Sequence, residues 1–66
     1  MKLILAEKIR EYRSRNRLTQ EEFGRLLGVS AQAVSKWERE ECYPDITFLP
    51  EIAALLHCSI NDLFDA

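Results

Sequence analysis

The chain has 66 residues, of which 47% are apolar and 30% charged, with two glycines and two prolines. This composition is typical of a folded globular domain and excludes a disordered or low-complexity chain. No apolar run approaches the roughly 20 residues that cross a bilayer, or the apolar segment of a secretory signal. We therefore expect one domain over residues 1–66, without a membrane segment, in the cytoplasm.

The net charge of −2 hides an uneven distribution of charge along the chain. Residues 1–39 hold all nine basic residues against five acidic ones, whereas residues 40–66 hold six acidic residues and no basic one. Such a division is typical of a protein that contacts a polyanion with one side only. An accidental distribution over solvated helix faces is the alternative.

The three residues that could bind a soft metal are Cys42, His57 and Cys58. They lack the paired C-x-x-C or H-x-x-x-H spacing of zinc sites, so we expect neither a metal nor another cofactor. A disulfide between the cysteines stays open, although reduced, partly buried thiols are favoured in a cytosolic chain.

The first predicted element is an amphipathic helix over residues 3–14. Its apolar residues recur at i, i+4 and i+7, and charged residues occupy the other side. These apolar residues are Leu5, Ile9 and Tyr12. The basic segment 13–17 leads out of this helix.

The run TQEE at residues 19–22 predicts the start of a second helix. Thr19 can cap its first turn while Glu22 reaches back to the Thr19 amide, which is the capping-box arrangement. We expect this helix to end at Gly28, because glycine adopts the left-handed conformation without a steric penalty. The residues expected to face inward are Phe23, Leu26 and Leu27.

A third helix is predicted over residues 31–39, with Ser30 as its cap. Val34 and Trp37 face the core in this arrangement. The outer side then carries only short or polar side chains, as a surface that enters a groove requires. These outer residues are Ala31, Gln32, Ser35 and Lys36.

Two shorter helices are predicted after Pro44. Asp45 or Thr47 can cap the first of them, and Thr47 fits better because it places Pro50 in the first turn. Its apolar stripe consists of Leu49, Ile52, Ala53 and Leu56. Ser59, with Asp62 three residues later, caps a last helix that carries Ile60, Leu63 and Phe64. No strand pattern is present.

The run LTQEEFGRLLGVSAQAVSKWE, followed by a proline and LPEIAALLHCSINDLF, resembles the phage-repressor and Cro-like (XRE) family over about residues 5–64. The features in register are the capping box, the small Gly24, the turn Gly28, Val34, Trp37 and Glu38. The resemblance implies an all-α fold, a compact five-helix lambda-repressor-like domain. Its second and third helices would form a helix-turn-helix, in which the later helix lies in the major groove of DNA.

The resemblance also implies a set of base-contacting residues on the third helix: Ala31, Gln32, Ser35 and Lys36. Gln32 is the clearest of them, because an amide presents a donor and an acceptor together and matches adenine N6 and N7. Ala31 suits a thymine methyl group. Lys36 suits either a guanine or a phosphate.

The corresponding phosphate-contacting residues are Gln20, Ser30, Arg39 and Arg17. Gln20 would be supported by the partial positive charge at the start of the second helix. Arg13 and Glu38 match positions that commonly form a partly buried ion pair. Such a pair fixes the orientation of the third helix more than it adds stability, because desolvation offsets most of the attraction.

One departure from the family pattern lies directly after the third helix. Family members often have glycine or asparagine there, followed by basic residues that bind the phosphate backbone. This chain has Glu40, Glu41, Cys42 and Tyr43 instead. The acidic loop is expected either to weaken DNA binding or to restrict it to a geometry that keeps the backbone away.

These features predict a non-enzymatic, sequence-specific regulator of transcription that binds double-stranded DNA, associates with the nucleoid and acts as a repressor. A homodimer on an inverted repeat is expected, with candidate interface residues Leu63, Phe64, Leu3 and Ile4. One histidine, with no nucleophile and base together and no phosphate loop, leaves no chemistry to assign, and no small-molecule ligand is evident. The alternative is a protein-interaction module that keeps the fold without binding DNA. The chain could also be part of a longer regulator.

Overall fold

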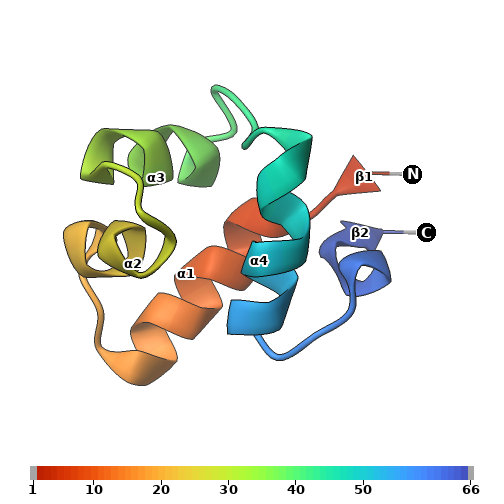
Figure 1. The fold of residues 1–66 in the computed structure, drawn as a ribbon, viewed down its shortest axis with the longest axis horizontal. Helices are drawn as coiled ribbons and strands as arrows, with labels where there is room; N and C mark the ends of the chain where they lie inside the picture. The colour runs from red at the N-terminus through yellow and green to blue at the C-terminus, as the bar shows by residue number, and fades with distance from the viewer. Residues whose placement is uncertain (1, 66) are drawn as a thin grey trace.

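The computed structural model describes residues 2–65, and its helices pack around a central core (Figure 1). The elements in chain order are β1 (Lys2–Leu3), α1 (Leu5–Asn16), α2 (Gln20–Leu27), α3 (Ala31–Glu38), the 3₁₀ helix η1 (Ile46–Phe48), α4 (Leu49–Leu55), the 3₁₀ helix η2 (Ile60–Leu63) and β2 (Phe64–Asp65). In the described part of the chain, no helix is both long enough and apolar enough to span a membrane.

The two ends of the chain differ from the prediction, because they pair with one another (Figure 1). β1 and β2 are antiparallel, with Leu3 opposite Phe64, and the amide of Ile4 donates to the carbonyl of Leu63 at 2.8 Å. The first helix therefore begins at Leu5. The last predicted helix is a 3₁₀ turn that becomes extended at Phe64, so residues 2–65 contain four α-helices, and the expected five were wrong.

The core lies where all the helices meet. Side chains with no exposed surface come from every α-helix and from η2: Ile9 of α1, Phe23 of α2, Val34 of α3, Ile52 of α4 and Leu63 of η2. Because the contributing residues are spread over the whole chain, the core fixes how α2 and α3 sit relative to α1.

The contact between α2 and α3 depends on Gly24 rather than on Leu26. A Cβ atom at Gly24 would lie 2.5 Å from the carbonyl oxygen of Val29, so the two helices can approach only where no side chain intervenes. The buried face of α2 therefore runs through Phe23 and Gly24. Leu26, predicted to face inward, is 56% exposed because it lies outside this face.

All four α-helices end with the same left-handed turn. The amide that follows the left-handed residue donates to the carbonyl five residues earlier, at 2.9 Å in each case, which is the Schellman arrangement. The left-handed residues are Arg17, Gly28, Glu40 and His57. Only one of the four is glycine, so three helix ends place a side chain where glycine is favoured.

The helix starts follow the predicted caps with one exception. The Thr19–Glu22 capping box is present in both directions, at 2.8 and 3.0 Å, and the Ser30 hydroxyl accepts from the amide of Ala33 at 3.1 Å. Before α4, the cap is Asp45 rather than Thr47, because the chain first forms η1 and the Asp45 carboxylate accepts from the Thr47 amide at 2.9 Å.

Candidate nucleic-acid interface

Two eight-residue helices joined by a tight turn form the part of the molecule that was predicted to meet DNA. α2 ends at Leu27, Gly28 adopts φ of 76°, and α3 begins at Ala31. In Figure 1, these two helices lie together on one side of the molecule. α1 packs against α3, and Tyr12 of α1 meets Phe23 of α2 edge to face, with ring centroids 6.0 Å apart. This is the geometry of a helix-turn-helix, whose second helix is the one that enters a groove.

The outer face of α3 carries the four predicted base-contacting residues together. Val34 and Trp37 are buried on the opposite face, which fixes the rotation of the helix about its axis. Gln32 and Lys36 are exposed, whereas Ala31 and Ser35 are partly covered. The exposed side chains are therefore an amide and an ammonium, both able to donate hydrogen bonds to base edges.

A shallow hollow of about 480 Å³ lies beside this face, between α2 and the start of α3. Gly28, Ala31 and Gln32 line it from the turn and from α3. Glu21 and Arg25 line it from α2, where they form an ion pair at 3.3 Å. Glu21 and Arg25 were not predicted to belong to the interface, although their i, i+4 spacing indicates an ion pair on the exposed side of α2.

Arg13 and Glu38 join α1 to the last residue of α3 through a fork-shaped contact. The Arg13 guanidinium donates to both carboxylate oxygens, at 2.6 and 2.8 Å, and a third nitrogen donates to the carbonyl of Leu18 at 2.9 Å. Glu38 is 5% exposed at its side chain. Arg10 adds a hydrogen bond of 2.6 Å to the Glu38 carbonyl. Together these contacts fix where α3 ends against α1.

The Glu38 carboxyl is held in its charged form. Burial acts to raise its pKa, but hydrogen bonds from Arg13 and Gln20, together with the nearby positive charges of Arg13 and Arg10, outweigh burial and lower the pKa below its ordinary value. The hydrogen bond to Glu38 raises the pKa of Arg13 in turn, against the opposing effect of burial. Both partners are therefore charged at neutral pH.

The four predicted phosphate-contacting residues lie in different surroundings. Gln20, at the start of α2, donates its side-chain amide to Glu38 at 3.2 Å. Ser30 uses its hydroxyl as the cap of α3, and Arg17 is exposed at the left-handed end of α1. Arg39 is paired with Glu41 at 2.5 Å. The structure therefore brings the acidic loop into contact with a residue predicted to bind phosphate.

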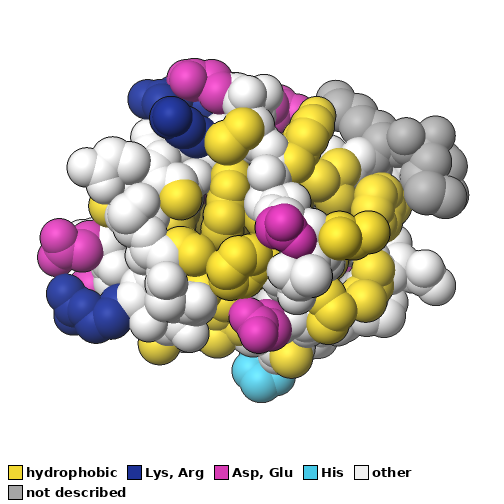
Figure 2. All heavy atoms as spheres, turned by 45° about the horizontal axis from the view of Figure 1, so that its top comes forward, with side chains coloured by type: hydrophobic (Ala, Val, Ile, Leu, Met, Phe, Trp, Pro, Cys, Tyr) yellow, Lys and Arg dark blue, Asp and Glu magenta, His cyan; other side chains and the backbone are white. Residues whose placement is uncertain are grey.

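Apolar side chains form a broad band across the face seen in Figure 2, in which the α3–η1 connection at the top of Figure 1 is turned toward the viewer. Two large apolar side chains are exposed in this connection and at the start of η1. They are Tyr43, which is 62% exposed, and Ile46, which is 77% exposed. The residues named earlier for a dimer interface are less accessible. Leu63 is fully buried, so its assignment was wrong, and Leu3, Ile4 and Phe64 are half-buried.

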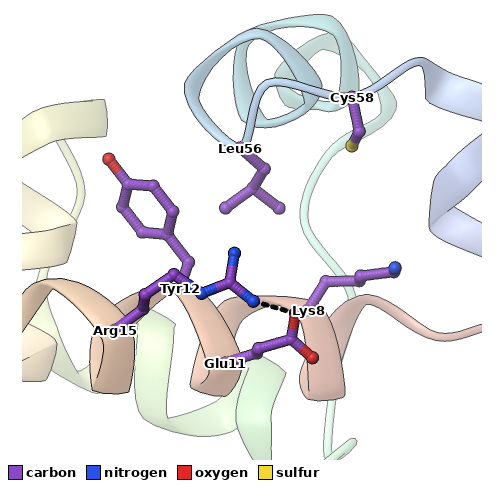
Figure 3. Close-up of a pocket in the computed structure, with 6 residues that line it drawn as sticks. All are labelled: Lys8, Glu11, Tyr12, Arg15, Leu56 and Cys58. Carbon is purple, nitrogen blue, oxygen red and sulfur yellow. Dashed lines mark hydrogen bonds and ion pairs between the residues drawn. The ribbon is translucent and has the colours of Figure 1, made fainter.

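A second hollow lies away from the helix-turn-helix, between α1 and the end of α4 (Figure 3). Lys8, Tyr12, Leu56 and Cys58 line it, together with the ion pair of Glu11 and Arg15 at 2.8 Å. Its volume of about 210 Å³ lies below the roughly 300 to 1,000 Å³ of pockets that bury a drug-sized ligand. None of its lining residues belongs to α2 or α3.

Cys58 and Cys42 are free thiols, so the two cysteines do not form a disulfide. Cys42 is exposed after α3, whereas Cys58 is half-buried against the core. Among residues 2–65, no three side chains of histidine, cysteine, aspartate or glutamate converge in a metal-binding group.

Comparison with known proteins places this architecture in a family. The model of a helix-turn-helix family matches residues 9–63, which include α2, the turn and α3. The chain belongs to the XRE-type helix-turn-helix family. This match confirms the predicted family, whose members include DNA-binding regulators of transcription.

The chain is similar to two curated relatives and to one solved structure. Repressor protein C2 of Salmonella phage P22 is 36% identical over 85% of this chain, and the HTH-type transcriptional activator BcrR of Enterococcus faecalis is 37% identical over 86% of it. The chain spans about a quarter of the length of these relatives. A crystal structure of the P22 c2 repressor with the synthetic operator 9T superposes with a TM-score of 0.81, at 34% identity, over 94% of both chains.

Proposed function

We propose that the chain is a sequence-specific DNA-binding transcriptional repressor, which inserts α3 into the major groove and binds an inverted repeat as a homodimer. The observation that carries this proposal is the outer face of α3, where polar Gln32 and Lys36 stand exposed while Val34 and Trp37 anchor the helix from behind. Repression needs only occupation of an operator, and a reading helix supplies that without catalytic chemistry or a cofactor. In this role the protein works in the cytoplasm, on the nucleoid.

The base contacts follow from the chemistry of the outer face. Gln32 presents its amide donor and acceptor to adenine N6 and N7, and Ala31 lies beside it to meet a thymine methyl group. Lys36, one turn further along, donates to guanine or to a phosphate, and Ser35 completes the face. Glu21 and Arg25, across the hollow from Gln32, border the same surface.

The phosphate contacts surround this face. Gln20 and Ser30 stand at the starts of α2 and α3, where helix amides favour an anion. Arg17 and Arg39 stand at the ends of α1 and α3 and supply positive charge. Phosphate contacts position a protein on the duplex, whereas the base contacts of α3 supply sequence preference.

The homodimer is supported by the small size of one reading surface. A single helix-turn-helix makes few base contacts, so two copies are needed for tight and selective binding. The exposed Tyr43 and Ile46 supply the large apolar side chains that an interface core requires. Two-fold symmetry then sets half-site centres about 10 to 10.5 base pairs apart, or a multiple of this distance.

Selection from a pool of randomised duplexes at low salt tests the proposal, with binding measured afterwards by fluorescence anisotropy. We expect enrichment of one sequence that contains two inverted half-sites at the stated spacing. The matched control is the Gln32→Ala, Lys36→Ala double variant, which keeps the fold because both side chains are exposed. Failure of the wild-type chain to enrich any sequence would reject DNA reading.

That negative result would favour the second candidate function, a protein-interaction module built on the same fold. The observation behind this alternative is that residues 40–66 carry six acidic residues and no basic one, next to the exposed Tyr43 and Ile46. Such a surface would suit a partner with a basic rim and an apolar centre. If the wild-type chain enriches one duplex sequence, the protein-interaction module is rejected.

A further inference from the structure

The buried carboxylate of Glu38 accepts a hydrogen bond from Gln20, the residue of α2 that is predicted to contact a DNA phosphate. We infer that Glu38 is a positioning residue for DNA binding, which fixes the side-chain amide of Gln20 so that one N–H is held by the protein and the other is presented to a phosphate. This inference rests on the proposed function, because it assumes that Gln20 meets the DNA backbone.

The geometry links three helices through one oxygen atom. Oε1 of Glu38 accepts from Arg13 at 2.8 Å and from the Gln20 amide nitrogen at 3.2 Å. Glu38 is almost fully buried, whereas Gln20 is half-buried at the first position of α2. The Gln20 side chain therefore spans the distance from a buried acceptor to the surface.

The orientation of the amide follows from its donors and acceptors. A glutamine amide has two N–H donors and one carbonyl acceptor, whereas a carboxylate and a phosphate both only accept. An isolated glutamine could turn its oxygen toward the DNA and would then meet a phosphate with an acceptor. Because the ionised Glu38 accepts only, it selects the orientation in which nitrogen faces inward and the second N–H of the same nitrogen stays available.

A carboxylate close to the DNA backbone would ordinarily repel it, but Glu38 is neutralised. Arg13 donates to both of its oxygens, and Arg10 donates to its backbone carbonyl. The amide therefore bridges a compensated ion pair and a phosphate. Ordering the Gln20 side chain before DNA binds also lowers the entropy lost on association.

The arrangement couples the phosphate contact to the reading helix. Glu38 is the last residue of α3, so any displacement of α3 relative to α2 moves the acceptor that orients Gln20. A phosphate contact made through Gln20 thus favours the position of α3 at which the network is complete. Glu38 contributes to sequence reading in this way without contacting the DNA.

A cycle of four variants on the selected duplex tests this role by fluorescence anisotropy. Gln20→Ala is compared in the wild-type chain and in the Arg13→Met, Glu38→Met background, where the acceptor is replaced by apolar side chains; such exchanges of buried ion pairs are often tolerated. We expect Gln20→Ala to weaken binding by about 10- to 100-fold in the wild type, the size of one hydrogen bond to a charged group. In the double-methionine background the same change should cost less than about 2-fold.

Equal losses in both backgrounds would overturn the inference, because Gln20 would then meet the phosphate unaided. No loss in the wild type would overturn it as well, since Gln20 would make no contact. In both cases the wild-type chain still enriches an inverted repeat, so the proposed function survives. Absence of any enriched sequence would reject both together.

Nuclear magnetic resonance of the Gln20 side-chain NH₂ supplies a readout that a purely structural role would not change, and it needs only the wild-type chain if the double-methionine variant does not fold. We expect one of the two protons to be shifted downfield and protected in the free protein, and the second to become so only when the duplex is added. Two equivalent, rapidly exchanging protons in the free protein would overturn the inference.

Discussion

Arg39 and Glu41 pair at 2.5 Å across the left-handed Glu40, which turns the chain back so that Glu41 lies against the last turn of α3. The amide of Glu41 donates to the carbonyl of Lys36 at 2.9 Å, and this hydrogen bond holds the turn in place. A guanidinium proposed to contact a phosphate is therefore already occupied by a carboxylate. DNA has to compete with Glu41 for Arg39.

Glu41→Gln is expected to tighten DNA binding by about 2- to 5-fold at moderate salt, because Arg39 then no longer has to leave its ion pair with Glu41 before it contacts a phosphate. The gain is small because an exposed ion pair of this kind contributes little. The slope of log affinity against log salt should steepen by about 0.9, the value of one added phosphate contact. The matched control is Glu40→Gln, which removes the same charge from a residue that forms no ion pair among the described residues. Equal effects of the two variants would show that only overall charge matters.

Arg39→Ala completes the same experiment. In the Glu41→Gln background it should weaken all duplex sequences about equally and lower the salt slope by about 1, as expected for a phosphate contact. In the wild-type background we expect a smaller loss, since Glu41 already neutralises the guanidinium. A change in the preferred sequence would instead place Arg39 at a base edge.

Gln32→Ala tests the reading face directly. We expect a loss of about 1 to 3 kcal/mol on the preferred duplex and a flattened preference at one base position, because a bidentate contact to adenine would be removed. Binding to unrelated sequences should change little. Selection repeated with the variant measures both effects, and an unchanged base preference would mean that Gln32 does not face the groove.

The sequence predicted those features that depend on residues close together in the chain. The capping boxes at Thr19 and Ser59 and the Ser30 cap each join a side chain to a backbone amide three residues away, so their patterns are visible in the sequence. The polar outer face of α3 was predicted in the same way, because helical periodicity separates it from Val34 and Trp37.

Features that depend on distant residues were missed unless the family resemblance supplied them, as it did for the ion pair of Arg13 and Glu38. Gln20 and Glu38 are 18 residues apart, and no local pattern shows that one amide reaches a carboxylate also bound by Arg13. Strands of two residues are too short for alternation to be recognised, which hid the pairing of Leu3 with Phe64. Leu26 was misplaced because the close approach at Gly24, not apolar periodicity alone, decides which face of α2 is buried.

His57→Gly is expected to stabilise the protein. His57 has φ of 58° after α4, a conformation that costs an ordinary residue roughly 1 to 2 kcal/mol, partly offset by the greater freedom of glycine in the unfolded chain. A net gain of about 1 kcal/mol would raise the melting temperature by roughly 4 to 8 °C in a domain of this size. Gly28→Ala is the matched opposite change at φ of 76°, and thermal unfolding should show a lower melting temperature.

The pH dependence of stability should report the Glu38 network. The pKa of Glu38 is lowered in the folded protein, so its contribution to stability is complete above its unfolded value of about 4.3 and is lost as the pH falls through the lower folded value. Glu22, Asp45 and Asp62 have lowered pKa values as well, because each accepts hydrogen bonds at a helix start. Acid should therefore destabilise the wild type through several groups at once.

Comparison with the Arg13→Met, Glu38→Met variant isolates the contribution of the ion pair. Urea unfolding of both proteins between about pH 7 and about pH 3 measures the difference in their free energies of unfolding, and the three carboxylates at helix starts contribute equally to both. We expect the wild type to lose more stability than the variant mainly below about pH 4.3, where Glu38 is more than half protonated in the unfolded chain. If the free energies of unfolding of the two proteins fall in parallel throughout this range, the Glu38 carboxyl has the same pKa in the folded and the unfolded chain. That result would contradict the effect expected from its contacts with Arg13 and Gln20.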